Sequence, residues 1–411
     1  MIYNIKDKPP TGKLVLFSVQ MVLSVFVATV LIANICGVNV GAGLVGAGLA
    51  TLIYTIITSG GSPMFISNSG AFVAPVIMAL AAAGYTGVMT GAITTFIIYM
   101  VFGLIFKTIP VEKIYNIFPP TLIGAVTMVI GINLMGFIPT YLGETGQWGV
   151  IVAFITTLSI ALLSHYAKGI VKILPFLLGI LIGYAVATVL TVTGIIQLVD
   201  FSVFNGVTLI QWPEFAFTKF MATDFAVLVP IIITYAAFTV SAMMECLSDH
   251  AALGGIIGTD LYQTPGLHKI FMGEGFANLA SAFFGGLGAC SYGEGVACVG
   301  FSRVASVIVV RVAALILIAL GFIGPVQAFI ASIPSCVFAG AAIILYGFIA
   351  CSGVKMLQRI DLNNQKNLVI VSSVLSLGIS GVVFGNNIIS LSATALALVM
   401  GVILNLILKE Q

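Results

Sequence analysis

Three carboxylates in apolar surroundings are the residues of this sequence most able to do chemistry. Glu245 and Asp249 stand four positions apart in an apolar stretch, and Glu294 lies between two glycines in the run GLGACSYGEGVACVGFSR, residues 286–303. A charged side chain at membrane depth costs about 2.5 to 3.5 kcal/mol even on lenient insertion scales, so such residues usually serve a function. Carboxylates that share a low-dielectric site cannot all ionise cheaply. We therefore expect Glu245, Asp249 and Glu294 to exchange a proton that travels with a substrate.

Glycines flank Glu294 and leave the backbone bare around it. Gly293 and Gly295 surround Glu294, and Gly70 follows Ser69 in a similarly broken stretch. Backbone N–H groups at the start of a half-helix can donate to a ligand there. Carboxylate acceptors beside N–H donors complement a planar solute with alternating N–H and C=O groups, and Tyr292 and Phe72 either cover its face or belong to the core. The expected substrate-binding residues are Ser69, Gly70, Phe72, Glu245, Tyr292, Gly293, Glu294 and Gly295.

The remaining candidate groups favour structural roles. Glu274 is expected to make structural hydrogen bonds, and Asp249 is either structural or functional. His165 and His268 fall in predicted cytoplasmic loops. His250 is expected at a solvated helix end, with a place in a proton path as the alternative. The six cysteines show no metal-ligand spacing. We expect no metal and no cofactor other than the transported proton, and without a nucleophile and base pair we do not expect an enzyme.

The amino-acid composition indicates which kind of secondary structure positions this site. With 60% hydrophobic and 7% charged residues and a mean hydropathy of +1.21, the chain is predicted to be an all-α, multi-pass membrane protein. The amino terminus lacks a signal-peptide pattern. We place fourteen apolar segments that can cross a bilayer. Two of them, 66–83 and 288–303, are short and are interrupted by Gly, Ser and Pro. The fourteen segments are 14–36, 41–58, 66–83, 87–107, 119–138, 148–166, 170–194, 226–248, 270–287, 288–303, 304–323, 331–350, 366–384 and 388–408.

The positive charges predict the orientation of these segments. On this map nearly all lysines and arginines between segments fall on one side, with Lys219 on the other side and Arg311 inside a segment. Cytoplasmic loops carry this excess of positive charge, so both termini are expected in the cytoplasm. The residues on that side are Lys6, Lys8, Lys13, Lys107, Lys113, Lys168, Lys172, Lys269, Arg303, Lys355, Arg359, Lys366 and Lys409.

Two halves of seven segments resemble one another. PVEKIYNIFPP at 110–120 matches PVQAFIASIPS at 325–335, and NSGAFVAP from Asn68 matches GEGVACVG from Gly293, which sets Ser69 opposite Glu294. An odd number of segments per repeat inverts the second repeat, an arrangement of secondary transporters whose sites lie where broken helices meet. We predict a first repeat at 1–199, an extracellular connector at 200–225 and a second repeat at 226–411, with strand-like breaks in segments 3 and 10.

The sequence resembles the nucleobase–ascorbate transporter family, in particular its bacterial uracil and xanthine permeases. Its signature is Gln or Glu, then Asn, any residue, Gly, four residues, Thr and usually Arg. Here Glu294 and Arg303 fit, whereas Gly295, Ala297 and Ser302 replace the Asn, Gly and Thr. VQMVLSVFVATVL, SGAFVAPV, DLYQTPGLHKIFMGEG and YGFIACSGVKML extend the resemblance over essentially the whole chain.

The resemblance implies a function and an architecture. Glu245 and Glu294 would bind the base, and backbone N–H groups near Gly70 and Gly293 would hold its carbonyl oxygens. It further implies proton symport by alternating access, a core domain of segments 1–4 and 8–11, a gate domain of segments 5–7 and 12–14, and homodimers in the bacterial inner membrane with no nucleic-acid partner. Asp249 stands where uracil permeases often have His, and Gly295 replaces a bracing Asn.

These departures leave alternatives for the substrate. Uracil is the first expectation, and xanthine, uric acid or another purine the second. An anion carrier of the sulfate or bicarbonate type with the same seven-plus-seven architecture is the alternative from a different class. It would require positive charge or open helix ends at the site, where Glu245 and Glu294 would repel an anion.

Overall fold

The computed structural model describes residues 1–108, 113, 116–136, 138–142, 146–168, 171, 175–358, 360–382, 384–385, 390–391 and 393–408. Residues 110–112, 114 and 115 of the repeat at 110–120, together with Lys172, Arg359 and Lys409, lie outside these residues. The elements up to the connector are α1 (Thr11–Ile35), α2 (Val40–Ile57), β1 (Ile66–Asn68), η1 (Gly70–Phe72), α3 (Val73–Thr108), α5 (Pro120–Met135), α6 (Ile138–Leu142), α7 (Gly146–Tyr166) and α8 (Pro175–Val192).

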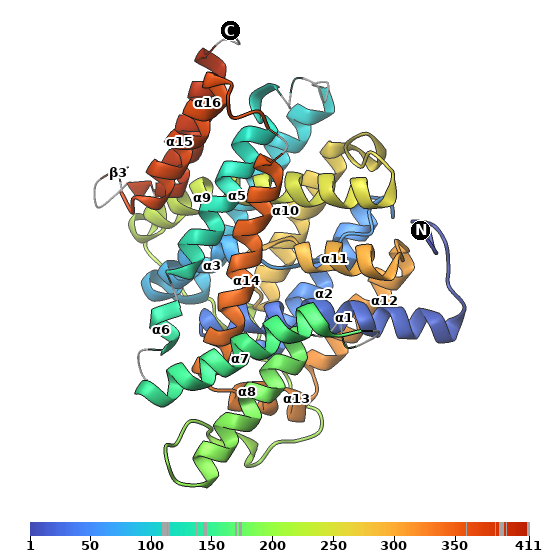
Figure 1. Cartoon of the computed structure of the whole chain (residues 1–411), viewed down its shortest axis with the longest axis vertical. Helices are drawn as coiled ribbons and strands as arrows, with labels where there is room; N and C mark the ends of the chain where they lie inside the picture. The colour runs from blue at the N-terminus through green and yellow to red at the C-terminus, as the bar shows by residue number, and fades with distance from the viewer. Residues whose placement is uncertain are drawn as a thin grey trace.

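The connector and the second half of the chain are also mostly helical. Their elements are η3 (Phe201–Phe204), η4 (Ala216–Lys219), α9 (Phe225–Ile257), η5 (Tyr262–Gly266), α10 (Leu267–Phe284), β2 (Ala289–Ser291), α11 (Gly293–Ser302), α12 (Val307–Gly321), α13 (Gly324–Ser332), α14 (Ser335–Leu357), α15 (Gln365–Ile379), β3 (Phe384–Gly385), β4 (Ser390–Leu391) and α16 (Ala393–Ile407). The two helical ribbons that carry the chain ends are visible in blue and red in Figure 1.

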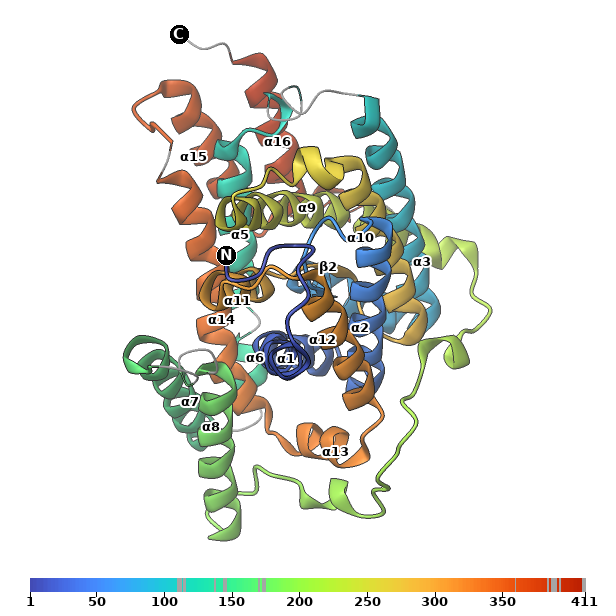
Figure 2. The same cartoon turned by 90° about the vertical axis from the view of Figure 1, so that its right-hand side faces the viewer.

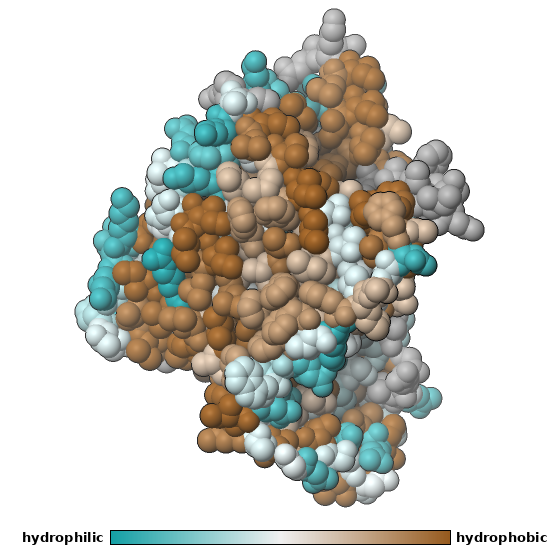
Figure 3. Space-filling model, turned by 180° about the vertical axis from the view of Figure 1, so that it is seen from behind, coloured by the Kyte–Doolittle hydropathy of each residue, from teal (hydrophilic) through white to brown (hydrophobic). Residues whose placement is uncertain are grey.

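The chain is a multi-pass membrane protein. Among the described residues, seven helices are long and apolar enough to cross a bilayer, and four shorter apolar helices accompany them. Each of the fourteen predicted segments overlaps a helix, while the number of crossings and the inverted repeat stay predictions. The space-filling view shows a broad hydrophobic face with hydrophilic residues gathered toward its margins (Figure 3). Large apolar side chains such as Leu104, Phe154 and Leu158 are exposed, as a lipid-facing surface requires.

Two helices depart from the expected boundaries. The ribbon of α3 runs through both segment 3 and segment 4, but Ala83 and Gly84 are non-helical, with Gly84 at φ +56°, so two helices meet there at a kink. The helix α9 continues nine residues beyond the predicted end at position 248, to Ile257. It ends where Gly258 takes a left-handed φ of +73° and its N–H bonds to the carbonyl of Gly254.

The helices pack in two groups. One group, which we call the inner group, comprises α1, α2, α3, α9, α10, α11 and α12, and the other, the outer group, comprises α5, α7, α8, α14, α15 and α16. In Figure 2, α2, α3, α10 and α12 lie on the right, whereas α5, α7, α8, α14 and α15 lie on the left. The helices α9 and α1 contact members of the outer group, so the boundary between the groups runs along them.

The chain that follows each of the two broken segments, 66–83 and 288–303, is held by hydrogen bonds to a distant extended segment. Residues 2–7, which we call the N-terminal strap, lie beside residues 303–307 after α11. The N–H of Ala305 donates to the Tyr3 carbonyl at 2.9 Å, and the N–H of Val307 donates to the Ile5 carbonyl at 3.0 Å. At the kink in α3, the Thr86 hydroxyl and the Met221 backbone exchange hydrogen bonds of 2.9 and 2.8 Å. Each broken stretch is thus followed by a linker tied to a distant segment.

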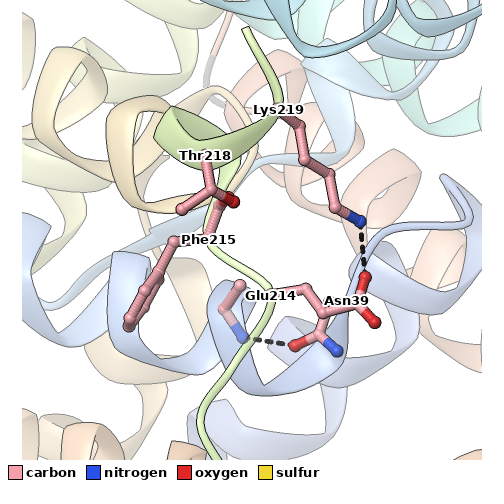
Figure 4. Close-up of polar contacts among 6 residues, drawn as sticks. Asn39, Glu214, Phe215, Thr218 and Lys219 are labelled. Carbon is pink, nitrogen blue, oxygen red and sulfur yellow. Dashed lines mark hydrogen bonds and ion pairs between the residues drawn. The ribbon is translucent and has the colours of Figure 1, made fainter.

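The connector passes close to the start of α2 (Figure 4). Asn39 caps this helix by accepting from the N–H of Ala42 at 2.9 Å, and Lys219 forms an ion pair with Glu214 nearby (Figure 4). The pKa of Lys219 is raised because its ammonium donates to the Glu214 carboxylate. Both side chains are exposed, so this ion pair contributes little to the free energy of unfolding.

Candidate functional site

The site is built on a pair of strands from distant parts of the chain. The strands β1 and β2 run antiparallel, and their register places Ile66, Ser67 and Asn68 opposite Ser291, Cys290 and Ala289. They form the strand-like breaks expected in segments 3 and 10. Both faces are buried among helices, so their backbone groups must find partners within the protein. The pairing supplies these partners and places the starts of η1 and α11 next to one another in space.

Asn68 braces this crossing. Its carboxamide oxygen accepts from the N–H of Leu287 at 3.1 Å, and its nitrogen donates to the Thr29 carbonyl of α1 at 3.3 Å. The Thr29 hydroxyl in turn lies 2.6 Å from the Ser67 hydroxyl. A fully buried asparagine with these partners fixes both strands to α1.

The helix α11 begins with an open amino-terminal end. Its N-cap residue, Tyr292, makes no side-chain capping bond, and the next residues are Gly293 and Glu294. The first N–H groups of a helix have no partner within the helix and carry partial positive charge. This end therefore offers donors to a ligand beside the half-buried carboxylate of Glu294.

Two further carboxylates of α9 approach the same place. The Ser69 hydroxyl donates to the Glu245 Oε2 at 3.1 Å and accepts from the N–H of Ala71 at the same distance. One turn on, Asp249 Oδ2 is buried without a hydrogen-bond partner among the described residues. A Cβ atom added to Gly293 would lie 3.7 Å from Asp249 Oδ1, so this carboxylate stands beside the start of α11. An unpaired buried carboxylate oxygen calls for a donor, which a ligand can provide.

These groups line one cavity of about 490 Å³ between the inner and outer groups of helices. Its volume lies in the range of small-molecule sites. The neighbouring helices α5, α9, α11 and α14 can be followed in Figure 2. The inner side contributes the six predicted residues Gly70, Glu245, Asp249, Tyr292, Gly293 and Glu294, and the outer side contributes Thr127, Ile130, Phe176, Leu345, Tyr346, Phe348, Cys351 and Lys355.

Three predicted site residues lie behind the cavity wall. Ser69 is buried and reaches the site through Glu245. Phe72 is fully buried and stacks on Tyr235 with ring centroids 5.8 Å apart, so it belongs to the core and does not cover a ligand face. Gly295 is also buried, and a Cβ atom there would lie 3.1 Å from Phe65 Cβ. Its missing side chain thus allows α11 to pack closely against the segment before β1.

Two other polar residues have structural partners. Glu274, expected to be structural, is fully buried and accepts from the Tyr99 hydroxyl at 2.8 Å and the Ser291 N–H at 3.0 Å. The expectation of a solvated His250 is wrong: the residue is fully buried and its Nε2 lies 2.6 Å from the Tyr54 hydroxyl. The cause is the extension of α9 past position 248, which puts His250 inside the helix.

The cation inside a segment does not neutralise the site. Arg311 on α12 donates to the hydroxyl and the carbonyl of Thr55, both at 3.1 Å. Among the residues that line the cavity, Lys355 carries the positive charge, and it lies on α14 together with Cys351. The carboxylates of α9 and α11 therefore dominate the electrostatics of the cavity.

The sequence did not identify the outer wall of the cavity. Tyr346 and Phe348 lie in an apolar helix whose residues look alike in sequence, whether they face lipid, the core or a ligand. The signal that exists is local: Cys351 and Lys355 stand four apart, which places them on one face near the end of α14. Only the packing of α14 against α5 shows which face meets the cavity.

The fold also occurs in known structures. The fold is similar to the transmembrane domain of the cyanobacterial bicarbonate transporter BicA, with a TM-score of 0.66, 18% identity and coverage of 97% of this chain and 98% of that chain. It is likewise similar to the murine anion transporter Slc26a9 in its inward-facing state, with a TM-score of 0.69, 12% identity and coverage of 98% and 68%. At these identities the likeness describes the fold alone.

Relatives in sequence are closer. The chain is 33% identical to the uracil permease of Bacillus caldolyticus over 100% of this chain and 95% of the relative. It is 31% identical to the uracil permeases of Bacillus subtilis, over 99% and 95%, and of Escherichia coli K12, over 99% and 94%. The profile of the xanthine/uracil permeases, described as the Permease family, matches residues 12–387. With its carboxylate-lined cavity and with relatives matched over their nearly full length, the chain belongs to the xanthine/uracil permease family.

Proposed function

We propose that this chain imports a nucleobase, uracil first, by proton symport across the bacterial inner membrane. The observation that carries the proposal is the joint lining of one cavity by Glu245, Glu294 and the open start of α11. Uracil presents N–H and C=O groups in alternation around a planar ring. Carboxylates accept from its N–H groups, and backbone N–H groups donate to its carbonyl oxygens. The names of the relatives agree with this substrate.

The carboxylates also provide a reason for proton coupling. Glu245, Asp249 and Glu294 share a cavity in a medium of low dielectric constant, where three negative charges repel one another. A proton taken up with the base lowers this cost, and its release returns the empty site to its starting state. Xanthine or uric acid is the second substrate candidate, because the glycine at position 295 leaves the site without the Asn of the family signature.

The site disfavours the anion carriers that share the fold. An anion in the cavity would meet three carboxylates, whereas Lys355 is the cation in the wall that the structure describes. Repulsion between unit charges 4 Å apart amounts to about 4 kcal/mol at an effective dielectric constant of 20. A neutral base with N–H donors avoids this repulsion. We therefore propose a nucleobase, and not an anion, as the substrate.

The two groups of helices suggest how the site is exposed. The inner group holds the carboxylates, and the outer group closes the cavity from the other side. We propose that they move as the core and gate domains of an alternating-access transporter. Homodimers joined through the outer group and cytoplasmic termini complete the proposal.

The decisive experiment is uptake of radiolabelled uracil by proteoliposomes. Glu294→Gln keeps the size of the side chain but removes its charge, and we expect it to abolish uptake, because one hydrogen bond to a charged group contributes about 1.5–3 kcal/mol and the site uses several. Glu214→Gln, in the connector, is the matched control and should transport normally. Normal uptake by Glu294→Gln would refute the proposed site.

Coupling and substrate are tested separately. An uncoupler should stop accumulation of uracil against its gradient, whereas exchange of labelled for unlabelled uracil should continue. Accumulation that persists would indicate another ion or a uniporter. Competition of uracil uptake by xanthine, uric acid, guanine and hypoxanthine then ranks the bases.

A further inference from the structure

A second polar cluster lies beside the cavity but does not line it. It consists of Cys246 and His250 on α9 and Glu274 on α10, all fully buried. Their thiol sulfur, imidazole nitrogen and carboxylate oxygen lie within 4.8 Å of one another. None of the three lines the 490 Å³ cavity. The proposed transport function therefore leaves this convergence of ligand-type atoms unused.

The atoms have the chemistry and spacing of a zinc or cadmium site. A thiolate, an imidazole and a carboxylate are the three ligand types that Zn²⁺ accepts, and soft thiolate favours such ions over Mg²⁺ and Ca²⁺. Zinc bonds of about 2.3 Å to sulfur and 2.0 Å to nitrogen place tetrahedral ligand atoms about 3.5 Å apart. The Cys246 Sγ and the His250 Nδ1 lie 3.6 Å apart. The spacing of four residues on α9 holds this pair on one face.

Further polar groups already orient these ligands. The Tyr54 hydroxyl lies 2.6 Å from the His250 Nε2, and the Tyr99 hydroxyl and the Ser291 N–H donate to the Glu274 carboxylate at 2.8 and 3.0 Å. Hydrogen bonds of this kind fix ring orientation and carboxylate position around a metal. The His250 Nδ1 is 2.8 Å from the Cys246 carbonyl. A metal would replace that bond, and Nε2–H would then donate to Tyr54.

The charges balance when a divalent ion binds. The ion contributes two positive charges, the Cys246 thiolate and the Glu274 carboxylate one negative charge each, and a neutral imidazole none. A neutral complex avoids the large cost of burying an uncompensated charge. The thiol proton, and that of Glu274 when the carboxyl is protonated, leaves to solvent. Cys290 is a further thiol at hand, since its Sγ lies 3.6 Å from the Glu274 Oε2.

An entry route to this cluster exists. His250 lines a second cavity of about 300 Å³, together with Gly254, Gly258 and Asp260 at the end of α9. Asp260 is exposed, so this cavity reaches the surface. An ion can therefore approach the imidazole without passing through the proposed base site.

We propose that Cys246, His250 and Glu274 bind one soft divalent cation, Zn²⁺ or Cd²⁺, and thereby join α9 to α10. Titration of the detergent-purified full-length protein with Cd²⁺ tests the site, because a cadmium–thiolate bond absorbs in the ultraviolet. We expect one Cd²⁺ per chain, with that absorbance, and a higher melting temperature that follows the fraction bound. Zn²⁺ should compete for the same site.

Variants assign the signal to these residues. Cys246→Ala and His250→Asn should each weaken Cd²⁺ binding by at least about 10-fold, and Cys246→Ala should remove the thiolate absorbance. Cys336→Ala is the matched control, since Cys336 is another buried free cysteine but lies on α14, outside the cluster. It should bind Cd²⁺ as the unmodified protein does. Gel filtration confirms that each variant is folded.

Several results would overturn the site. The site is refuted if the unmodified protein shows no thiolate absorbance with Cd²⁺. It is equally refuted if Cys246→Ala retains that absorbance, or if His250→Asn binds Cd²⁺ as tightly as the unmodified protein does. Should Cys246→Ala fail to fold, the result with His250→Asn and the unmodified protein still decides. Since the assay measures metal binding alone, its outcome is independent of the test of uracil transport.

Discussion

At the scale of the residue, the site depends on how Glu245 is held. The Ser69 hydroxyl donates to the Glu245 carboxylate at 3.1 Å, from the position just before η1. This bond engages one oxygen of the carboxylate, so that in the proposed site the other oxygen can accept from the base. We therefore expect Ser69 to act as a positioning residue for Glu245.

Ser69→Ala should therefore weaken transport without disturbing the fold. A hydrogen bond to a charged group contributes about 1.5–3 kcal/mol, so we expect KM for uracil to rise by about 10-fold or more. Ser69→Thr keeps the hydroxyl and should restore much of the affinity. Ser24→Ala is the control, because the Ser24 hydroxyl donates to the Met21 carbonyl of its own helix at 2.8 Å and Ser24 does not line the cavity. Equal KM values for Ser69→Ala and Ser24→Ala would contradict this role.

Residue types alone predict part of the site. Carboxylates and glycines in apolar sequence carry a strong signal because burying charge is costly, which is why Glu245, Asp249 and Glu294 stand out. Aromatic residues carry no such signal. Phe72 and Tyr346 are both aromatic residues in apolar stretches of the sequence. Nevertheless, Phe72 stacks on Tyr235 in the core, whereas Tyr346 lines the cavity. The burial of His250 is not evident from the sequence, because α9 continues past position 248 and the partner of His250, Tyr54, is 196 positions away.

At the scale of the element, broken helices are held by strands from elsewhere. The crossing of β1 and β2 satisfies their backbone groups, and the N-terminal strap does the same for the linker after α11. The sequence indicated the breaks through Gly, Ser and Pro. It offered no sign of the strap, because a short polar segment before the first apolar helix resembles any free terminus.

Deletion of residues 2–7 should loosen the linker after α11. The strap shares several backbone hydrogen bonds with residues 303–307, and each contributes about 1 kcal/mol net, so the melting temperature in detergent should fall by several degrees. Replacing Asn4 and Lys6 by Ala keeps the backbone bonds and should have little effect. A deletion variant as stable as the intact chain would show that the strap is dispensable.

At the scale of the whole molecule, the cavity lies where two groups of helices meet. The inner group contributes the carboxylates, and the outer wall is mostly apolar apart from Thr127 and Lys355, so in the proposed mechanism the inner group binds the ligand and the outer group covers it. Segment lengths and the pattern of positive charge predict the elements, but the face that each helix turns toward the cavity depends on packing between segments more than a hundred residues apart. Alternating access then predicts that the outer wall becomes more or less accessible as the groups move.

Cys351 provides the test of this motion. Of the six free cysteines, Cys351 is the exposed one, and it lines the cavity on α14 beside Lys355. A membrane-impermeant maleimide should label Cys351 in inside-out vesicles, because Lys355 is predicted to face the cytoplasm. Saturating uracil should slow the labelling several-fold, since the base fills the cavity and draws the groups together. Cys351→Ser removes the labelled site and identifies the signal, and Glu294→Gln should label at the same rate with or without uracil. Labelling that uracil does not change in the unmodified protein would separate Cys351 from the transport path and argue against closure of α14 over the base.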